Sequence, residues 1–174
     1  METPTAQEVY HFAVYGTLRD DCDALSKQEW TQKFCTGLTA TPLTALVHGM
    51  KMVYKQLVSE NWPYAIQSDS SSDSIVVRVL QFRDNWAEKL KEADDVEQYD
   101  PDAPDSSPLG YRRKVVPAIV LDADNNPTDQ VVYAVMYYIA DLEPNSQYYS
   151  VLNGDWLQRD IAYHSQPQPI AQQE

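Results

Sequence analysis

Segments rich in β-branched and aromatic residues recur along the chain, and polar turn-forming residues separate them. The strand-like segments are Val9–Tyr15, 39–47, 50–58, Ile75–Phe82, 111–121 and Val131–Ile139. Pro117 interrupts one of them, which is typical of an edge strand or a bulge. Because about six strands follow one another with only two or three helices among them, the pattern predicts an α+β fold built on a largely closed or strongly curled sheet.

Helical signals occupy the remaining segments. The longest predicted helix spans 85–99, with Asn85 as its N-cap and a glutamate three residues later. A shorter helix is expected at 26–37, where a capping-box sequence opens the segment and a glycine closes it. A third helix is predicted at 146–161, broken at Asn153-Gly154.

Size and charge restrict the class of protein and its partners. The 174 residues predict a single domain over residues 1–174, with its core at about 9–161 and polar ends outside that core. The net charge of −13 repels phosphate backbones and anionic lipid surfaces, so we expect neither nucleic acid nor membrane as a partner. The absence of a secretory-signal pattern and the presence of only two cysteines predict a cytoplasmic protein, either a monomer or a homodimer.

The usual signatures of cofactor-dependent chemistry are missing from the sequence. Its five glycines are too far apart for a phosphate-binding loop or a dinucleotide fingerprint. The three histidines lack metal-ligand spacing with the cysteines, and there is no Gly-x-Ser-x-Gly motif. We therefore expect no cofactor and no metal, and a chemistry carried out by side chains and backbone groups.

Glu97 is the residue that fits its surroundings least. At about 100° per residue, Leu90, Ala93 and Glu97 fall on one side of the long predicted helix, so its apolar stripe continues into a carboxylate. Asp94 and Asp95 fall outside this stripe and are expected to face water. A carboxyl group on the core side loses hydration, which disfavours its ionised form and suits a general acid/base near neutral pH.

Two other interpretations of Glu97 remain open from the pattern alone. In the last turn of a helix the side chain can rotate out to solvent, or it can pair with Arg112 or Arg113. The segment VYGTLR at 14–19 is equally open to two interpretations. A buried strand that ends at Gly16 exposes successive backbone N–H groups that can bind a carboxylate or an oxyanion, but an ordinary turn has the same pattern.

An ordered set of motifs resembles the γ-glutamylcyclotransferase-like superfamily, which includes the AIG2-like proteins and γ-glutamylamine cyclotransferases. VYGTLR at 14–19 resembles its first motif, and ADDVEQYDP at 93–101 resembles its second, usually Leu-Asp-x-x-Glu-Gly. YRRKVV at 111–116 resembles the Tyr-x-Arg strand that follows. The segments similar to the family's middle and late strands are HGMKMVY at 48–54, WPYAI at 62–66, IVVRVLQF at 75–82 and VVYAVMYYI at 131–139.

This resemblance implies a mixed β-barrel with flanking helices and a pocket between the loop at 15–19 and Glu97. It implies that Glu97 is the catalytic residue and that a small γ-glutamyl substrate closes on itself, without a cofactor, to release 5-oxoproline and an amine or amino acid. The residues implied to bind this substrate are Tyr15, Gly16, Thr17 and Leu18. Arg19 either pairs with the substrate α-carboxylate or is a surface arginine beside two aspartates.

The chain departs from the family pattern at four places. Ala93 replaces the motif leucine, Gln98 replaces the glycine after the glutamate, Arg78 stands where glycine is common, and 100–110 is an insertion at the rim of the implied pocket. These departures leave the particular γ-glutamyl compound open. They are also compatible with a non-enzymatic domain that keeps the fold and binds a small molecule or a protein, whereas the retained Glu97 and the Tyr-Gly-Thr-Leu loop favour an enzyme.

Overall fold

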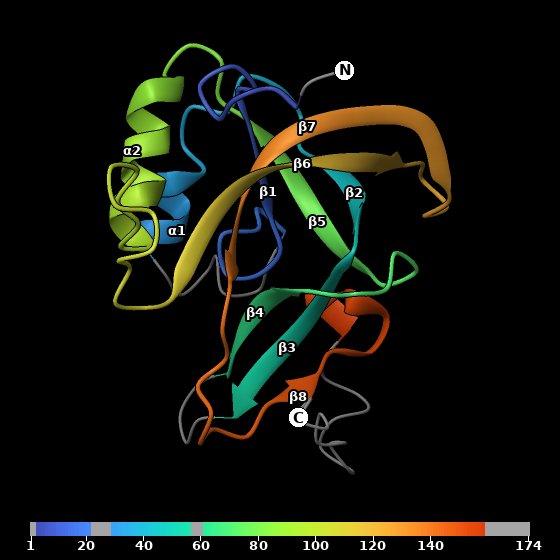
Figure 1. The fold of residues 1–174 in the computed structure, drawn as a ribbon. Coiled ribbons are helices and arrows are strands. Elements are labelled where there is room, and N and C mark those ends of the chain that lie inside the picture. The colour runs from blue at the N-terminus through green and yellow to red at the C-terminus, as the bar shows by residue number, and fades with distance from the viewer. Residues whose placement is uncertain (1–2, 22–28, 57–60, 159–174) are drawn as a thin grey trace.

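One mixed sheet runs through the molecule. The computed structural model describes residues 3–21, 29–56 and 61–158, which form eight strands in the order β1-β5-β2-β6-β7-β4-β3-β8 (Figure 1). The strands are β1 (His11–Val14), β2 (Leu43–His48), β3 (Met50–Gln56), β4 (Asn61–Gln67), β5 (Ser74–Gln81), β6 (Tyr111–Leu121), β7 (Pro127–Ile139) and β8 (Tyr149–Ser150). Because β1 also pairs with β7, the first five strands in this order close into a barrel.

The closure of the barrel depends on β1. This strand pairs antiparallel with β5 along its whole length, and parallel with β7 through Phe12 and Val135. Side chains alternate across a strand, so β1 contributes to two cores. Ala13 packs inside the barrel, whereas Phe12 and Val14 pack outside it against the helices.

Two helices cover the outer face of the barrel on one side. In Figure 1, α1 (Glu29–Phe34) and α2 (Trp86–Val96) lie together beside β1. Aromatic rings fill the space beneath them: the Phe12 ring lies 5.4 Å from Phe34 and 4.6 Å from Trp86, centroid to centroid. This arrangement confirms the predicted α+β class and the mixed barrel with flanking helices.

The strands β4, β3 and β8 extend the sheet below the barrel (Figure 1). β4 joins β7 in parallel through Ile66 and Ile139, and β3 pairs antiparallel with β4 over seven residue pairs. β8 pairs with β3 where a helix was predicted, so that prediction is wrong. After β8 the chain makes two short 3₁₀ turns, η2 (Leu152–Gly154) and η3 (Trp156–Gln158), with Asn153 in the left-handed region at φ 60°.

Other local predictions divide between correct and incorrect. The helix predicted at 85–99 is α2, but the Asn85 side chain makes no capping hydrogen bond. Its buried Oδ1 has no hydrogen-bond partner among the described residues. Pro117 lies within β6 opposite Tyr133, beyond the residues that pair with β2 and two residues before a register shift. The start of the helix predicted at 26–37 and all residues after 158 lie outside the described residues.

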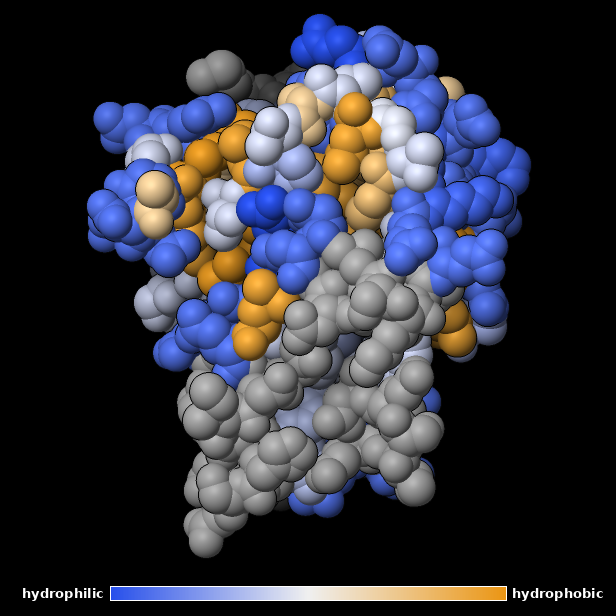
Figure 2. Space-filling model, turned by 180° about the vertical axis from the view of Figure 1, so that it is seen from behind, coloured by the Kyte–Doolittle hydropathy of each residue, from blue (hydrophilic) through white to orange (hydrophobic). Residues whose placement is uncertain are grey.

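The surface is mainly hydrophilic with separate apolar patches. Figure 2, the view from behind, shows apolar residues of the barrel wall between charged and polar ones. The exposed large apolar side chains come from several different elements: Tyr10, Val96, Leu109, Val131, Tyr133 and Leu157. Within the described residues, no helix is both long enough and apolar enough to span a membrane.

Candidate active site

A small cavity brings together most of the residues selected from the sequence. Its volume is about 70 Å³, and it lies where the loop after β1 meets the end of α2 and the strands β4, β6 and β7. Its lining consists of Ala13, Val14, Tyr15, Gly16, Thr17, Leu18, Trp62, Pro63, Glu97, Tyr111 and Tyr137. Glu97 and the whole Tyr15–Leu18 loop therefore share one cavity.

The loop after β1 forms a tight turn on the wall of this cavity. The Arg19 N–H donates to the Gly16 carbonyl at 3.0 Å and closes a tight turn. The N–H groups of Gly16, Thr17 and Leu18 donate to no acceptor within the described part of the chain. A Cβ atom on Gly16 would lie 2.5 Å from Pro63 Cγ, so glycine is required for the loop to approach β4 this closely.

Glu97 occupies the C-cap of α2, and the turn that follows fixes its position. The Gln98 N–H donates to the Asp95 carbonyl at 3.3 Å, and the Tyr99 N–H donates to the Asp94 carbonyl at 2.8 Å. Gln98 has φ 50°, in the left-handed region. These two bonds and this conformation define a Schellman motif, in which glycine is the usual residue at the position of Gln98. The left-handed backbone at this position explains why the family motif usually has glycine after the glutamate. This chain forms the same turn with Gln98.

Burial sets the protonation behaviour of Glu97. Loss of hydration raises the pKa of its carboxyl group to about 7. No cation within the described residues forms an ion pair with this carboxylate, so the alternative pairing with Arg112 or Arg113 is not present. A carboxyl group with this pKa exists in both protonation states near neutral pH, as a general acid/base requires.

Asp94 contradicts the prediction that it faces water. Its side chain is buried, forms an ion pair with Arg113 of β6, and accepts a hydrogen bond of 2.6 Å from the Tyr137 hydroxyl of β7. The Arg113 guanidinium also lies over the Tyr99 ring at 4.7 Å. The helical wheel misplaced Asp94 because two barrel strands supply polar partners to that face of α2. Asp95 is exposed, as predicted.

Arg19 lies outside the cavity lining. It is 2% exposed and makes a bidentate contact with Asp21 and a 2.9 Å ion pair with Asp155 near the end of the described chain. Arg19 is therefore neither a surface arginine nor a residue of the cavity wall. Its ion pairs connect the loop after β1 to the segment that contains Asp155. Arg78, the departure from the family glycine, holds Asp20 of the same loop through two bonds of 2.8 Å.

Sequence reasoning missed the four residues of β4, β6 and β7 that line the cavity. Trp62 and Pro63 belong to the WPYAI segment, and Tyr111 opens the Tyr-x-Arg strand, so both motifs were noticed without a role for these side chains. Tyr137 was one tyrosine among many in a predicted strand. Burial, together with the Glu97 charge, raises the pKa values of Tyr15 and Tyr111, so both hydroxyl groups stay protonated and remain hydrogen-bond donors.

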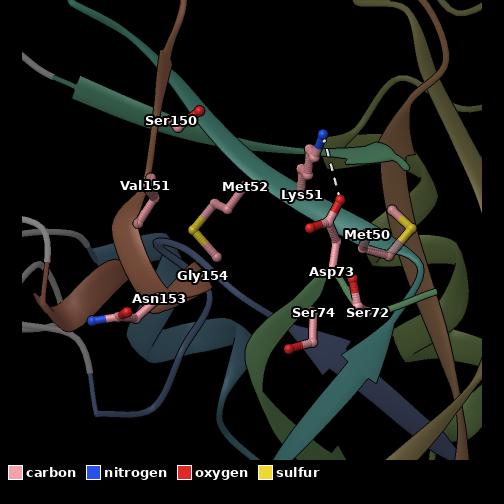
Figure 3. A pocket seen from close by; sticks show the side chains of 10 residues that line it. All are labelled: Met50, Lys51, Met52, Ser72, Asp73, Ser74, Ser150, Val151, Asn153 and Gly154. Atoms are coloured by element: carbon pink, nitrogen blue, oxygen red, sulfur yellow. Dashed lines mark ion pairs between the residues drawn. The ribbon is translucent and has the colours of Figure 1, made fainter. Parts of the chain in front are cut away.

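A second and larger cavity, of about 350 Å³, lies between β3, the turn before β5 and the segment after β8 (Figure 3). Its one charged pair, Lys51 and Asp73, is joined at 3.4 Å. None of the residues selected from the sequence lines it. The described residues contain no group of His, Cys, Asp and Glu side chains suited to a metal ion. Apart from Arg19, the candidate site residues selected from the sequence all line the smaller cavity.

Comparison with known families decides the classification. The sequence matches the family model described as "Gamma-glutamyl cyclotransferase, AIG2-like" over residues 12–158. The chain belongs to this family. Membership confirms the resemblance drawn from the motifs and indicates a cyclotransferase-type role. A search of curated proteins finds no match.

Two solved structures share the fold of this AIG2-like chain. YkqA from Bacillus subtilis has a TM-score of 0.52 and 15% sequence identity, and the match covers 91% of this chain and 43% of that one. An AIG2-like protein from Mus musculus has a TM-score of 0.51 and 18% identity, with 78% of this chain and 80% of that one covered. The chain thus spans less than half the length of the Bacillus protein. At these identities the likeness is one of fold.

Proposed function

We propose that the protein is a γ-glutamyl cyclotransferase that releases 5-oxoproline and a free amine or amino acid. The observation that carries the proposal is the Glu97 carboxyl group, which has a pKa of about 7 and no paired cation among the described residues. It shares one cavity with the loop after β1, whose N–H groups at 16–18 have no acceptor in that same part of the chain. A base and a set of backbone hydrogen-bond donors in one cavity are what an intramolecular acyl transfer needs. A cytoplasmic location is proposed with it, on the cysteine content.

The proposed reaction joins two ends of one substrate. The α-amine attacks the γ-carbonyl carbon, a five-membered lactam closes, and the C–N bond to the leaving amine breaks. Glu97 first removes a proton from the α-ammonium group and later returns one to the departing nitrogen. Holding the substrate in the ring-closing conformation converts binding energy into rate, because the reacting atoms start in contact.

The loop after β1 has the complementary role. The N–H groups of Gly16, Thr17 and Leu18 bind the oxyanion of the tetrahedral intermediate or the substrate carboxylate. Preorganised donors of this kind act without reorganising during the reaction, and removing one typically costs about 10²–10³-fold in rate. The close packing of Gly16 on Pro63 keeps these donors in place.

The test is direct product detection. The purified protein is incubated with γ-glutamyl amino acids, γ-glutamyl amines and glutathione, and 5-oxoproline is measured by mass spectrometry. We expect release from at least one class and none in the Glu97→Gln variant, since glutamine keeps the shape but cannot carry the proton. The loss of kcat should be about 10²–10⁴-fold. Unchanged turnover in a correctly folded Glu97→Gln sample would remove Glu97 from the mechanism.

A further inference from the structure

Arg112 and Arg113 follow Tyr111 in β6, and each forms an ion pair with an aspartate. Arg112 pairs with Asp105 at 2.9 Å, in the insertion at the rim of the cavity. Arg113 pairs with Asp94 in the last turn of α2, and these two side chains are only 9% and 10% exposed. An arginine cannot lose its charge at physiological pH, so its position decides which carboxylate it neutralises.

Arg113 lies beside the cavity. Side chains two residues apart on a strand point to the same face, so Arg113 shares the face of Tyr111. It is also the cross-strand partner of Tyr137, and both tyrosines line the cavity with Glu97. Asp94 precedes Glu97 by three residues, which makes the two carboxylates neighbours at the end of the helix. The Arg113 guanidinium therefore binds the acidic residue that lies one helical turn before Glu97.

We propose that Asp94 is a positioning residue that keeps the Arg113 guanidinium away from Glu97, so that the Glu97 carboxyl group stays unpaired in the cavity. The Tyr137 hydroxyl, which donates to Asp94, and the Tyr99 ring beneath the guanidinium fix the pair in this orientation. The inference rests on the proposed function only in taking Glu97 to be the base of the reaction. The arrangement itself is a property of the folded chain.

The consequence for Glu97 is electrostatic. A cation within about 4–6 Å favours the ionised form of a carboxyl group and lowers its pKa by about 1–3 units. Such a carboxylate is a weak base for an ammonium proton. The titratable side chains that line the cavity with Glu97 are Tyr15, Tyr111 and Tyr137. The charged or titratable side chains beside these are Tyr64, Asp94, Arg112 and Arg113. The two arginines are the cations of this set, and both are neutralised elsewhere.

The test measures the titration midpoint of Glu97 by NMR of ¹³C-labelled glutamate side chains, assigned by comparison with Glu97→Gln. In Asp94→Asn, the released Arg113 should lower the midpoint from about 7 by about 1–3 pH units. In Arg113→Gln, the midpoint should stay near 7 or rise, because the cation is gone. In the double variant Asp94→Asn/Arg113→Gln, it should return to about 7.

A merely structural role gives a different set of results. Loosened packing would expose Glu97 and lower its midpoint toward 4.5 in all three variants, whereas the proposal requires a fall in Asp94→Asn alone. If Asp94→Asn does not fold, the other two variants still test the proposal. A lower titration midpoint of Glu97 in either of them overturns it. An unchanged midpoint in Asp94→Asn overturns it as well.

The matched control is Asp95→Asn, which removes the exposed carboxylate next in the chain and should leave the midpoint unchanged. Where the protein turns over a substrate, the acidic limb of kcat/KM against pH should move down with the midpoint in Asp94→Asn. Because the titration needs no substrate, a failure of the proposal is distinguishable from an absence of cyclotransferase activity, which only the 5-oxoproline assay reports.

Discussion

Replacing the Glu97 carboxyl group should stabilise the protein above neutral pH. In the unfolded chain Glu97 titrates near 4.5, and burial raises its pKa in the folded protein to about 7. Below 4.5 the group is protonated in both states and has no effect on stability. As the pH rises toward 7, the unfolded chain releases the proton first, so unfolding is favoured. The difference of about 2.5 pH units corresponds to about 3 kcal/mol lost from the free energy of unfolding above pH 7.

Glu97→Gln removes this titration, so its stability relative to wild type should change with pH. We expect no large difference at pH 4 and a gain of up to about 3 kcal/mol at pH 8, measured by urea unfolding at several pH values. Glu88→Gln is the matched control, since Glu88 lies exposed in the first turn of the same helix, and its difference should stay within about 0.5 kcal/mol throughout. A Glu97→Gln difference that does not vary between pH 4 and pH 8 would refute the reasoning.

Three further substitutions test the surroundings of the site. Gly16→Ala should lower the free energy of unfolding by about 1–3 kcal/mol and reduce 5-oxoproline release, because its Cβ would lie 2.5 Å from Pro63 Cγ. Unchanged stability in urea would show that the loop can shift to accept the methyl group. Gln98→Gly should raise the free energy of unfolding by up to about 1 kcal/mol, since φ 50° favours glycine, and a loss of stability would contradict this. Arg19→Met should cost about 1.5–3 kcal/mol, because it removes the charged hydrogen bonds from the buried guanidinium to the carboxylates of Asp21 and Asp155; a cost below 0.5 kcal/mol would mean that this anchor is dispensable.

The position of Glu97 followed from the sequence because it depends on one helix. Leu90 and Ala93 pack against the barrel, and the 100° rule carries this face to Glu97. The environment of Asp94 did not follow, because its partners come from β6 and β7, far along the chain. Helical periodicity describes which face a residue occupies, and it contains no information on what another element brings to that face.

The same distinction separates the other outcomes. Strand segments with dense β-branched and aromatic residues were predicted well, since their pattern is local. The segment after 146 was not, because β8 forms by pairing with β3 and a close backbone contact holds Gly154 against Ser74. Trp62 and Tyr137 likewise became part of the cavity only through the register of β4 and β7.

The parallel pairing of β1 with β7 bears on when the cavity forms during folding. The ribosome delivers β1 before the other barrel strands and its parallel partner β7 after them, so Phe12 and Val135 are far apart in the sequence. Until that pairing forms, α2 and the hairpins can exist while the loop after β1 has no wall opposite it. Pairings between distant segments form slowly during folding. We therefore expect the cavity to assemble late in folding, so that recovery of the proposed activity after denaturation would report barrel closure and follow the return of helical signal.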